Sequence, residues 1–375
     1  MAHSNKLRKL PLAFGTISSL TEVDLSRNRL KALPQTFARL ANLRTLKLFD
    51  NRIEVFDENW CKLGTLQRLD ISKNHIKVMP MKIAMLTNLR ELRCSANKIG
   101  EIPWQITELS KLRVFTLDKN GLEELPRLFG RLHTLRRLEL QENAFEELPQ
   151  TFTLLTSLEL LWLHDNQFRH LGNEFSRAQN ITSLAMSTNK MRDVPPCFSR
   201  LSGMQSMGLQ DNRITNVDPL CRGNTFTALE DLDLTNNSIE VLPDSIGELT
   251  CLKALWLTSN KLKTLPKTIG NMKRLEFLYT NQNRMKGLPD EFGGLCSLRF
   301  LTLEYNNLSS LPKTMGELSS LKTLRLFKNK NLEALPAELV LVKKMKLLEL
   351  DSAVLGGLSE AHLKWLDTIK NKRIQ

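Results

Sequence analysis

Apolar residues recur along this chain in a short pattern that repeats every 23 residues. Segment 229–243 reads LEDLDLTNNSIEVLP and segment 252–266 reads LKALWLTSNKLKTLP, so both follow the frame LxxLxLxxNxLxxLP. In the first segment Leu232 and Leu234 alternate with polar residues, which predicts a short strand that places both side chains on its inner face. Leu229 and Ile239 are expected to point inward from the turns beside that strand.

One asparagine marks the same place in each unit. It occurs at positions 5, 28, 51, 74, 97, 120, 143, 166, 189 and 212, and then at 237, 260, 283, 306 and 329. The one longer step, from Asn212 to Asn237, contains the segment DPLCRGNTFTAL. A short amide at this place can reach backbone groups that the turn leaves without partners, so we expect a hydrogen-bonded asparagine ladder along the repeats.

The second half of each unit predicts a short helical turn. Proline occupies one phase of the repeat at positions 11, 34, 80, 103, 126, 149, 195, 243, 266, 289, 312 and 336. The residues that follow, such as DSIGEL at 244–249, predict about one turn of 3-10 or irregular helix on the outer side. Asp57, Gly172 and Asp218 replace the proline, and we expect these three coils to turn differently and to alter the local curvature.

These features resemble leucine-rich repeats, whose period is about 20 to 29 residues. The period of 23 and the LPxxI/FGxL segment are similar to those of the intracellular Ras-group leucine-rich-repeat proteins over residues 5–353. That group includes the animal Ras–Raf scaffold, Ras suppressor proteins and plant relatives. The resemblance implies an α/β fold: a right-handed horseshoe of about 15 coils with a parallel concave β-sheet and short convex segments. It also implies a cytoplasmic scaffold in small-GTPase signalling.

The two ends of the chain give different expectations. We expect a solenoid over 1–353 and a capping helix over 354–375. The opening segment, 5–20, supplies only the return half of a coil and is expected to be uncapped. A truncated product, a dimer that buries this end, or tolerated fraying would each account for it.

At the other end, Ser359 is placed to cap a helix that has Leu363, Leu366 and Ile369 on one face. Trp365 is expected to pack this helix against the last coil rather than to anchor a partner. Three basic residues after the helix would complement its C-terminal dipole: Lys370, Lys372 and Arg373.

Composition favours a protein with a large core, since 41% of its residues are hydrophobic and 25% are charged. No apolar run approaches the roughly 20 residues that a membrane span needs. The six cysteines are scattered without a CxxC pair, and Cys94 falls on an inward strand position. A reduced, cytoplasmic setting is the simplest expectation.

Known catalytic motifs do not occur in the sequence. No phosphate-binding loop, dinucleotide fingerprint, zinc-protease motif or nucleophile elbow is found. His164 and Asp165 lie together at a strand end, but the frame supplies no nucleophile beside them. We therefore expect no catalytic residue, no metal and no cofactor.

Charge is separated between the expected strands and the rest of the surface. The chain carries a net charge of +13, yet the outward strand positions hold fifteen acids and nine bases. Because a nucleic acid needs positive charge along the groove that it occupies, nucleic-acid binding on the concave face is disfavoured. The basic flanks could meet anionic lipid headgroups or an acidic protein, or could simply be a solvated surface.

Aromatic residues gather on outward strand positions of the later repeats, where the core does not require them. We predict that they stack into one contiguous strip: Trp256, Phe277, Tyr279, Phe300, Tyr305 and Phe327. An aromatic strip beside Asp231 and Asp233 has the composition of a protein-binding hot spot. The alternative is that the rings stack on one another and stiffen the sheet. Trp162 and His164 form a second, smaller candidate island.

The sequence thus favours a non-enzymatic scaffold that binds a protein on its concave face. The resemblance suggests a Ras-family GTPase or its complex as the partner. From their outward positions beside the rings, Asp231 and Asp233 are expected to pair with basic partner residues. Two alternatives stay open: a membrane-peripheral adaptor that uses the basic flanks, and a recognition fragment of a larger kinase, GTPase, ligase or receptor. The oligomeric state does not follow from the sequence.

Overall fold

Each repeat forms one coil that contains a three-residue strand and, on the opposite side, a short helix. The computed structural model describes residues 3–172, 175, 177–221 and 226–374. In the coil 252–274, Leu252, Leu255 and Leu257 are completely buried. Since side chains alternate between the two faces of a strand, Trp256 is left pointing outward and is half-buried.

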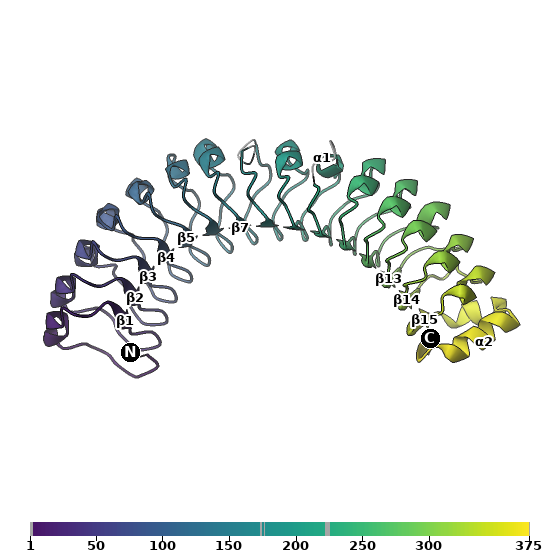
Figure 1. Cartoon of the computed structure of the whole chain (residues 1–375), viewed down its shortest axis with the longest axis horizontal. Helices are drawn as coiled ribbons and strands as arrows, with labels where there is room; N and C mark the ends of the chain where they lie inside the picture. The colour runs from purple at the N-terminus through teal and green to yellow at the C-terminus, as the bar shows by residue number, and fades with distance from the viewer. Residues whose placement is uncertain (1–2, 173–174, 176, 222–225, 375) are drawn as a thin grey trace. The chain divides into compact units, whose positions relative to one another are not determined.

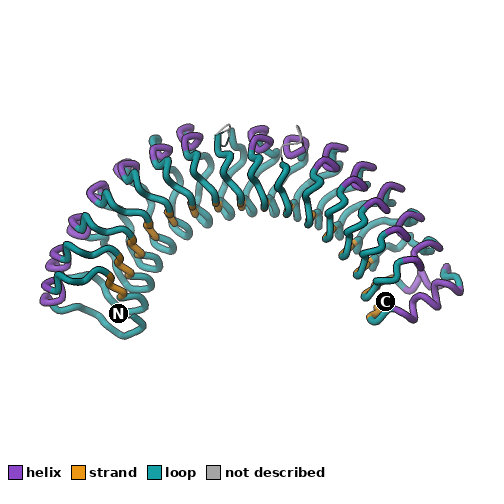
Figure 2. The backbone as a smooth tube through the Cα atoms, in the orientation of Figure 1, coloured by secondary structure: helices purple, strands orange, loops and turns teal. Residues whose placement is uncertain are grey.

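The first compact unit, Met1–Ala185, is a curved row of coils with a parallel sheet on its inner side and 3-10 helices on its outer side (Figures 1 and 2). Residues 23 apart lie side by side in neighbouring strands, as Glu22 lies beside Thr45. The strands are β1 (Glu22–Asp24), β2 (Thr45–Lys47), β3 (Arg68–Asp70), β4 (Glu91–Arg93), β5 (Val114–Thr116), β6 (Arg137–Glu139), β7 (Leu160–Trp162) and β8 (Ser183–Ala185). The 3-10 helices are η1 (Leu12–Thr16), η2 (Gln35–Arg39), η3 (Glu58–Lys62), η4 (Met81–Met85), η5 (Trp104–Glu108), η6 (Phe129–Arg131) and η7 (Gln150–Leu154).

The second compact unit, Met186–Gln375, is built in the same way. Its strands are β9 (Ser206–Gly208), β10 (Asp231–Asp233), β11 (Ala254–Trp256), β12 (Phe277–Tyr279), β13 (Phe300–Thr302), β14 (Thr323–Arg325), β15 (Leu347–Leu350) and β16 (Asn371–Ile374). Its helices are η8 (Pro196–Arg200), α1 (Asp218–Cys221), η9 (Asp244–Glu248), η10 (Lys267–Asn271), η11 (Asp290–Gly294), η12 (Lys313–Glu317), η13 (Ala337–Leu341), η14 (Ser352–Gly357) and α2 (Glu360–Thr368). The predicted leucine-rich-repeat solenoid with a parallel inner sheet is confirmed.

The predicted asparagine ladder joins neighbouring coils. The Asn283 side-chain oxygen accepts a hydrogen bond from the Leu262 backbone N–H at 2.9 Å, and its Nδ2 donates to the carbonyl oxygens of Leu257 and Thr280. Asn237 makes the equivalent bonds to Ile214 and Leu209 across the longer step. The amide thus satisfies buried backbone groups of two coils at once, which explains why one residue type recurs in this slot.

The three coils without the usual proline behave differently from one another. Asp57 adopts the extended backbone of the prolines, and its side chain accepts a bond from the Asn59 N–H, so η3 forms as the other 3-10 helices do. The expected change of turn at Asp57 is therefore wrong, because a capping carboxylate replaces the proline. At Asp218 the turn does change, to the short α-helix α1. The segment after Gly172 falls partly outside the described residues.

The C-terminal segment contains helix α2 and an added strand. The Ser359 hydroxyl accepts the His362 backbone N–H, and Trp365 is buried with its Nε1 donating to the Val342 carbonyl oxygen at 3.2 Å, so the expected cap and packing role are confirmed. Leu363 was expected on the packed face but is 50% exposed. The helix ends at Thr368, earlier than expected.

The basic residues that follow α2 do not extend the helix. Lys372 and Arg373 lie in strand β16, which pairs with β15 in parallel, beside Leu348 and Glu349. Lys372 Nζ lies 3.2 Å from Asp367 Oδ1 in the last turn of α2, and Arg373 Nη1 lies 3.4 Å from Glu349 Oε1. Their expected role at the helix dipole stays a prediction.

Candidate functional site

Outward side chains of β10 to β14 form two parallel rows in the second unit. The first row contains, in order, Asp231, Ala254, Phe277, Phe300 and Thr323. The second row contains Asp233, Trp256, Tyr279, Thr302 and Arg325. Because adjacent strands are about 4.8 Å apart, neighbours within a row can touch face to face.

Trp256 and Tyr279 form the tightest ring contact in these rows. Their ring centroids are 4.0 Å apart and their planes differ by 6°. The indole Nε1 also donates a hydrogen bond to Asp231 Oδ1 at 3.0 Å. Burial raises the pKa of the Asp231 carboxyl, and the hydrogen bond from Trp256 only partly offsets this. Burial likewise raises the pKa of the Tyr279 hydroxyl.

Phe277 and Phe300 stack in the first row. Their centroids are 5.0 Å apart with planes 10° from parallel, and both side chains are half-buried. Each ring covers one face of the other, and the rest of each ring remains partly accessible to solvent or to a partner.

Tyr305 and Phe327 form a third pair beyond the strands. Their centroids are 6.3 Å apart and the rings are nearly perpendicular, at 87°. Tyr305 has a φ of 54° and its side chain is 51% exposed, so the left-handed backbone at this slot directs the ring to solvent. The Lys328 Nζ lies 4.7 Å from the Phe327 ring centroid.

The rings therefore form three separate pairs, and the prediction of one contiguous strip is wrong. Rings 23 residues apart stack, but Tyr279 is followed in its row by Thr302 and Phe300 is followed by Thr323. These two threonines interrupt both rows. The alternative that the rings stack on one another describes their contacts, while the role of the rings as partner anchors stays a prediction.

The predicted acidic residues beside the rings are already engaged within the protein. Asp231 accepts the bond from Trp256, and Asp233 Oδ1 accepts the backbone N–H of Thr235 at 2.9 Å. Their negative charge still faces the outward side of β10, but neither carboxylate lacks a hydrogen bond.

A charged cluster borders the aromatic pairs. Glu349 lies 3.5 Å from Arg325 Nε and 3.4 Å from Arg373 Nη1. Burial raises the pKa of the nearby Glu304 carboxyl, against the attraction of Arg325. Arg373 reaches this cluster because β16 pairs with β15, which the sequence did not predict; the spacing of 24 residues between Glu349 and Arg373 was the available signal.

Trp162 and His164 lie in the first unit. The Arg137 guanidinium carbon is 5.0 Å from the Trp162 ring centroid, and His164 Nδ1 is 2.7 Å from Asp165 Oδ2. Both side chains are half-buried. The island is thus a cation–π contact beside a histidine–carboxylate pair.

Cross-strand ion pairs occupy the inner face of the first four strands of the first unit. Lys47 Nζ lies 2.9 Å from Glu22 Oε1, and Arg68 Nε lies 3.9 Å from Glu91 Oε2. Opposite charges alternate from strand to strand here, so they neutralise one another locally. The aromatic pairs of the second unit are therefore the stronger candidate for a binding surface.

Other kinds of site find little support in the part of the chain that the structure describes. Within it, no group of three or more His, Cys, Asp or Glu residues is placed to hold a metal ion. Among the same residues, no helix has the length and apolar character to cross a membrane. Burial raises the pKa of the Cys61 and Cys221 thiols to about 12, so neither is a thiolate near neutral pH.

Two family models match the chain. One, described as Leucine rich repeat, matches residues 3–53, and the other, described as Leucine-rich repeat region, matches residues 180–298. A search of curated proteins found no match.

Solved structures share the fold. A leucine-rich-repeat protein of Leptospira interrogans is 28% identical with a TM-score of 0.80, and the match covers 91% of this chain and 93% of that one. An internalin from Listeria monocytogenes is 24% identical with a TM-score of 0.72, over 82% of this chain and 87% of that one. The plant peptide hormone receptor RGFR1, solved in complex with RGF2, is 21% identical with a TM-score of 0.73, over 100% of this chain and 69% of that one. The last two likenesses establish the fold alone.

Proposed function

We propose that this leucine-rich-repeat protein is a non-enzymatic scaffold that binds a protein partner on the strand face of its second unit. The observation that carries the proposal is the set of three ring pairs on the outward side of the sheet, where the core of the coils does not need them. Repeats of this family form interaction modules, and their extended inner surfaces are the usual binding surfaces.

The ring pairs have the physical properties of binding anchors. Trp256, Tyr279, Phe277 and Phe300 are held by stacking and are half-buried, so little conformational entropy is lost when a partner covers them. Large rigid aromatic side chains dominate the energetics of most protein interfaces.

The charge beside the rings favours a basic partner segment. Asp231, Asp233 and Glu304 lie next to the ring pairs, and the raised pKa of Asp231 and Glu304 comes mainly from loss of water around their carboxyl groups. A partner arginine could stack on a ring and approach such a carboxylate at the same time. The same negative charge opposes a phosphate backbone, so we propose a protein and not a nucleic acid as the ligand of this face.

We further propose that the setting is the cytoplasm and that the pathway involves a Ras-type small GTPase or its complex. The support is the resemblance of the 23-residue repeat to the Ras-group proteins. Free thiols also favour a reducing compartment. They belong to Cys61, Cys94, Cys221, Cys251 and Cys296.

The proposal is tested by affinity capture from native cytosol with three baits. The wild type is compared with the double variant Tyr279→Ala, Phe300→Ala, and with the control Val114→Ala, Leu160→Ala. The control removes outward, half-buried apolar side chains from the strands of the first unit. We expect a partner that is captured by the wild type and the control and is lost with the first variant. If all three baits retain the same partners equally, the binding surface lies elsewhere on the protein.

A second experiment separates the GTPase assignment from the scaffold proposal. Purified Ras-type GTPase, loaded with GDP or with a non-hydrolysable GTP analogue, is titrated onto the wild type and the Tyr279→Ala, Phe300→Ala variant. Nucleotide-dependent binding that the variant loses supports the assignment. If the GTPase binds in neither nucleotide state, the GTPase assignment is rejected. The scaffold proposal is then decided by the capture experiment alone.

A further inference from the structure

A cationic hollow lies on the flank of the first coils, away from the strand face. Its volume is about 610 Å³. Five basic side chains from three successive coils line it, and among the described residues no acidic side chain does: Arg8, Lys9, Arg29, Lys31 and Arg52. These five positive charges account for part of the net positive charge that the sequence places on surfaces other than the strand face.

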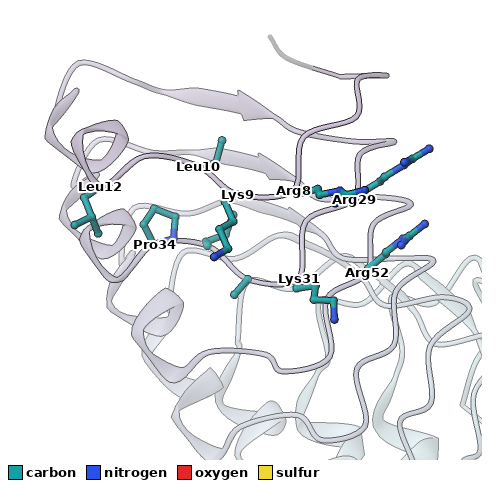
Figure 3. Close-up of a pocket in the computed structure, with 10 residues that line it drawn as sticks. Arg8, Lys9, Leu10, Leu12, Arg29, Lys31, Pro34 and Arg52 are labelled. Atoms are coloured by element: carbon teal, nitrogen blue, oxygen red, sulfur yellow. The ribbon is translucent and has the colours of Figure 1, made fainter.

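The hollow has two chemically different sides (Figure 3). Arg8, Arg29 and Arg52 point toward one side, and Leu12 and Pro34 lie at the opposite side. Leu12 is 67% exposed, which is unusual for an apolar side chain that borders a hollow. A ligand that fills this space would therefore meet cations and apolar surface together.

The five cations make no ion pair within the part of the chain that the structure describes. Among the described residues, none of them lies within ion-pair distance of a carboxylate, whereas nearby Lys47 pairs with Glu22 and Lys82 pairs with Glu58. Like charges held close together repel, so an anion in the hollow would relieve that repulsion.

The repeat extends the apolar side of the hollow along the row of coils. Ala32, Val55 and Val78 occupy one slot of the repeat at intervals of 23 residues, and both valines are about 70% exposed. A second hollow of about 430 Å³ begins at Ala32 and Val55. Its two acidic lining residues are engaged, since Asp57 caps η3 and Glu58 pairs with Lys82.

We propose that this flank binds an extended acidic peptide segment of a protein partner, with apolar side chains of the peptide in the hollows and its carboxylates on the arginines. A volume of several hundred Å³ suits a few side chains of a peptide. Arg8 and Arg52 are exposed, whereas Leu33, which also lines the hollow, is only 6% exposed, so a flat bilayer surface would reach these arginines and leave the apolar lining uncovered. The observations therefore favour the peptide over the membrane.

The test uses the full chain and a fluorescein-labelled peptide of sequence EELEELEE, with anisotropy as the readout. The variant Arg29→Glu, Arg52→Glu is compared with the control Lys261→Glu, Arg284→Glu. The control changes the same slot of the repeat and the same net charge in the second unit. We expect a Kd that rises about tenfold or more for the first variant and less than about twofold for the control. Thermal unfolding confirms that both variants are folded, and Arg29→Gln, Arg52→Gln replaces the first variant if it is not.

Two further ligands complete the test. The peptide EESEESEE should bind more weakly than EELEELEE, and the variant Leu12→Ser should remove most of that difference. Equal losses in both charge variants would mean binding by net charge alone and would overturn the proposal. Binding to phosphatidylserine vesicles that depends on Arg29 and Arg52, with no binding of EELEELEE, would overturn it in favour of a membrane contact.

Discussion

The indole ring of Trp256 lies flat against the phenol ring of Tyr279, with centroids 4.0 Å apart, and both rings face outward from neighbouring strands. The repeat places these residues 23 positions apart, so the strand register alone brings them together. The same indole donates its N–H to Asp231, which fixes the orientation of the stack. A rigid aromatic surface is therefore part of the folded protein before any partner arrives.

The first prediction concerns the strength of this stack. In a double-mutant cycle with Trp256→Leu and Tyr279→Leu, we expect a coupling free energy of about 0.5 to 1.5 kcal/mol in urea unfolding, because the leucines keep apolar bulk but lose the ring contact. A control cycle pairs Trp256→Leu with Tyr305→Leu, whose ring partner is Phe327, and should give a coupling near zero. Equal couplings in the two cycles would show that the stack adds nothing specific.

The second prediction concerns pH. Burial raises the pKa of Asp231 in the folded state, so its contribution to stability is fully present below the unfolded pKa and is lost as pH rises through the folded pKa. Asp231→Asn removes this dependence and keeps an oxygen for the Trp256 N–H. We expect the variant to be more stable than the wild type at neutral pH, with the difference shrinking toward zero near about pH 3. Urea unfolding at both pH values measures it, and a difference independent of pH would contradict the account.

The third prediction concerns the asparagine ladder. Asn283→Ala removes the amide that bonds Leu262 and Leu257 of the preceding coil. The buried Leu262 N–H is left without its partner, whereas the Leu257 carbonyl oxygen keeps only its bond from Asn260. We expect a loss of about 3 kcal/mol in the free energy of unfolding. Asn271→Ala, at an exposed position at the end of η10, is the control and should cost less than about 0.5 kcal/mol. Comparable losses would mean that the ladder bonds contribute little.

The fourth prediction concerns the outer side of the coils. A methyl group on Gly270 would overlap the carbonyl oxygen of Glu291 in the next coil, whereas one on Gly287 would meet nothing within 4 Å. Gly270→Ala should therefore lower the midpoint of thermal unfolding by overpacking, at a cost of about 1 to 3 kcal/mol. Gly287→Ala should leave the midpoint nearly unchanged. If both variants unfold at the wild-type temperature, the coils are packed more loosely on this side than described.

Much of the fold could be predicted from the sequence because each repeat carries the same pattern of apolar and polar residues and therefore forms the same coil. Leu232 and Leu234 are buried as their alternation predicts, and Asn237 makes the expected bonds. The pairing of the rings was also available, since adding 23 to 256 and to 277 gives 279 and 300. Adding 23 to Tyr279 gives Thr302, which is where the predicted strip ends.

Other features depend on side-chain conformation or on backbone pairing that no repeat encodes. The hydrogen bond from Trp256 to Asp231 follows from the indole rotamer. Strand β16 has no apolar alternation, since all four of its residues are exposed, and it forms by backbone pairing with β15. The excess of acids on the strand positions predicted surplus cations on other surfaces, but the gathering of five of them around one hollow could be seen only once the coils were stacked.

The most direct test of the central claim is the dissociation constant of a captured partner, measured by calorimetry with the purified wild type and with the Tyr279→Ala, Phe300→Ala variant. The account predicts a loss of about 2 kcal/mol or more, roughly a thirtyfold rise in Kd, with Val114→Ala, Leu160→Ala unchanged. An unchanged Kd for Tyr279→Ala, Phe300→Ala would contradict it and leave the ring pairs as elements that only stiffen the sheet.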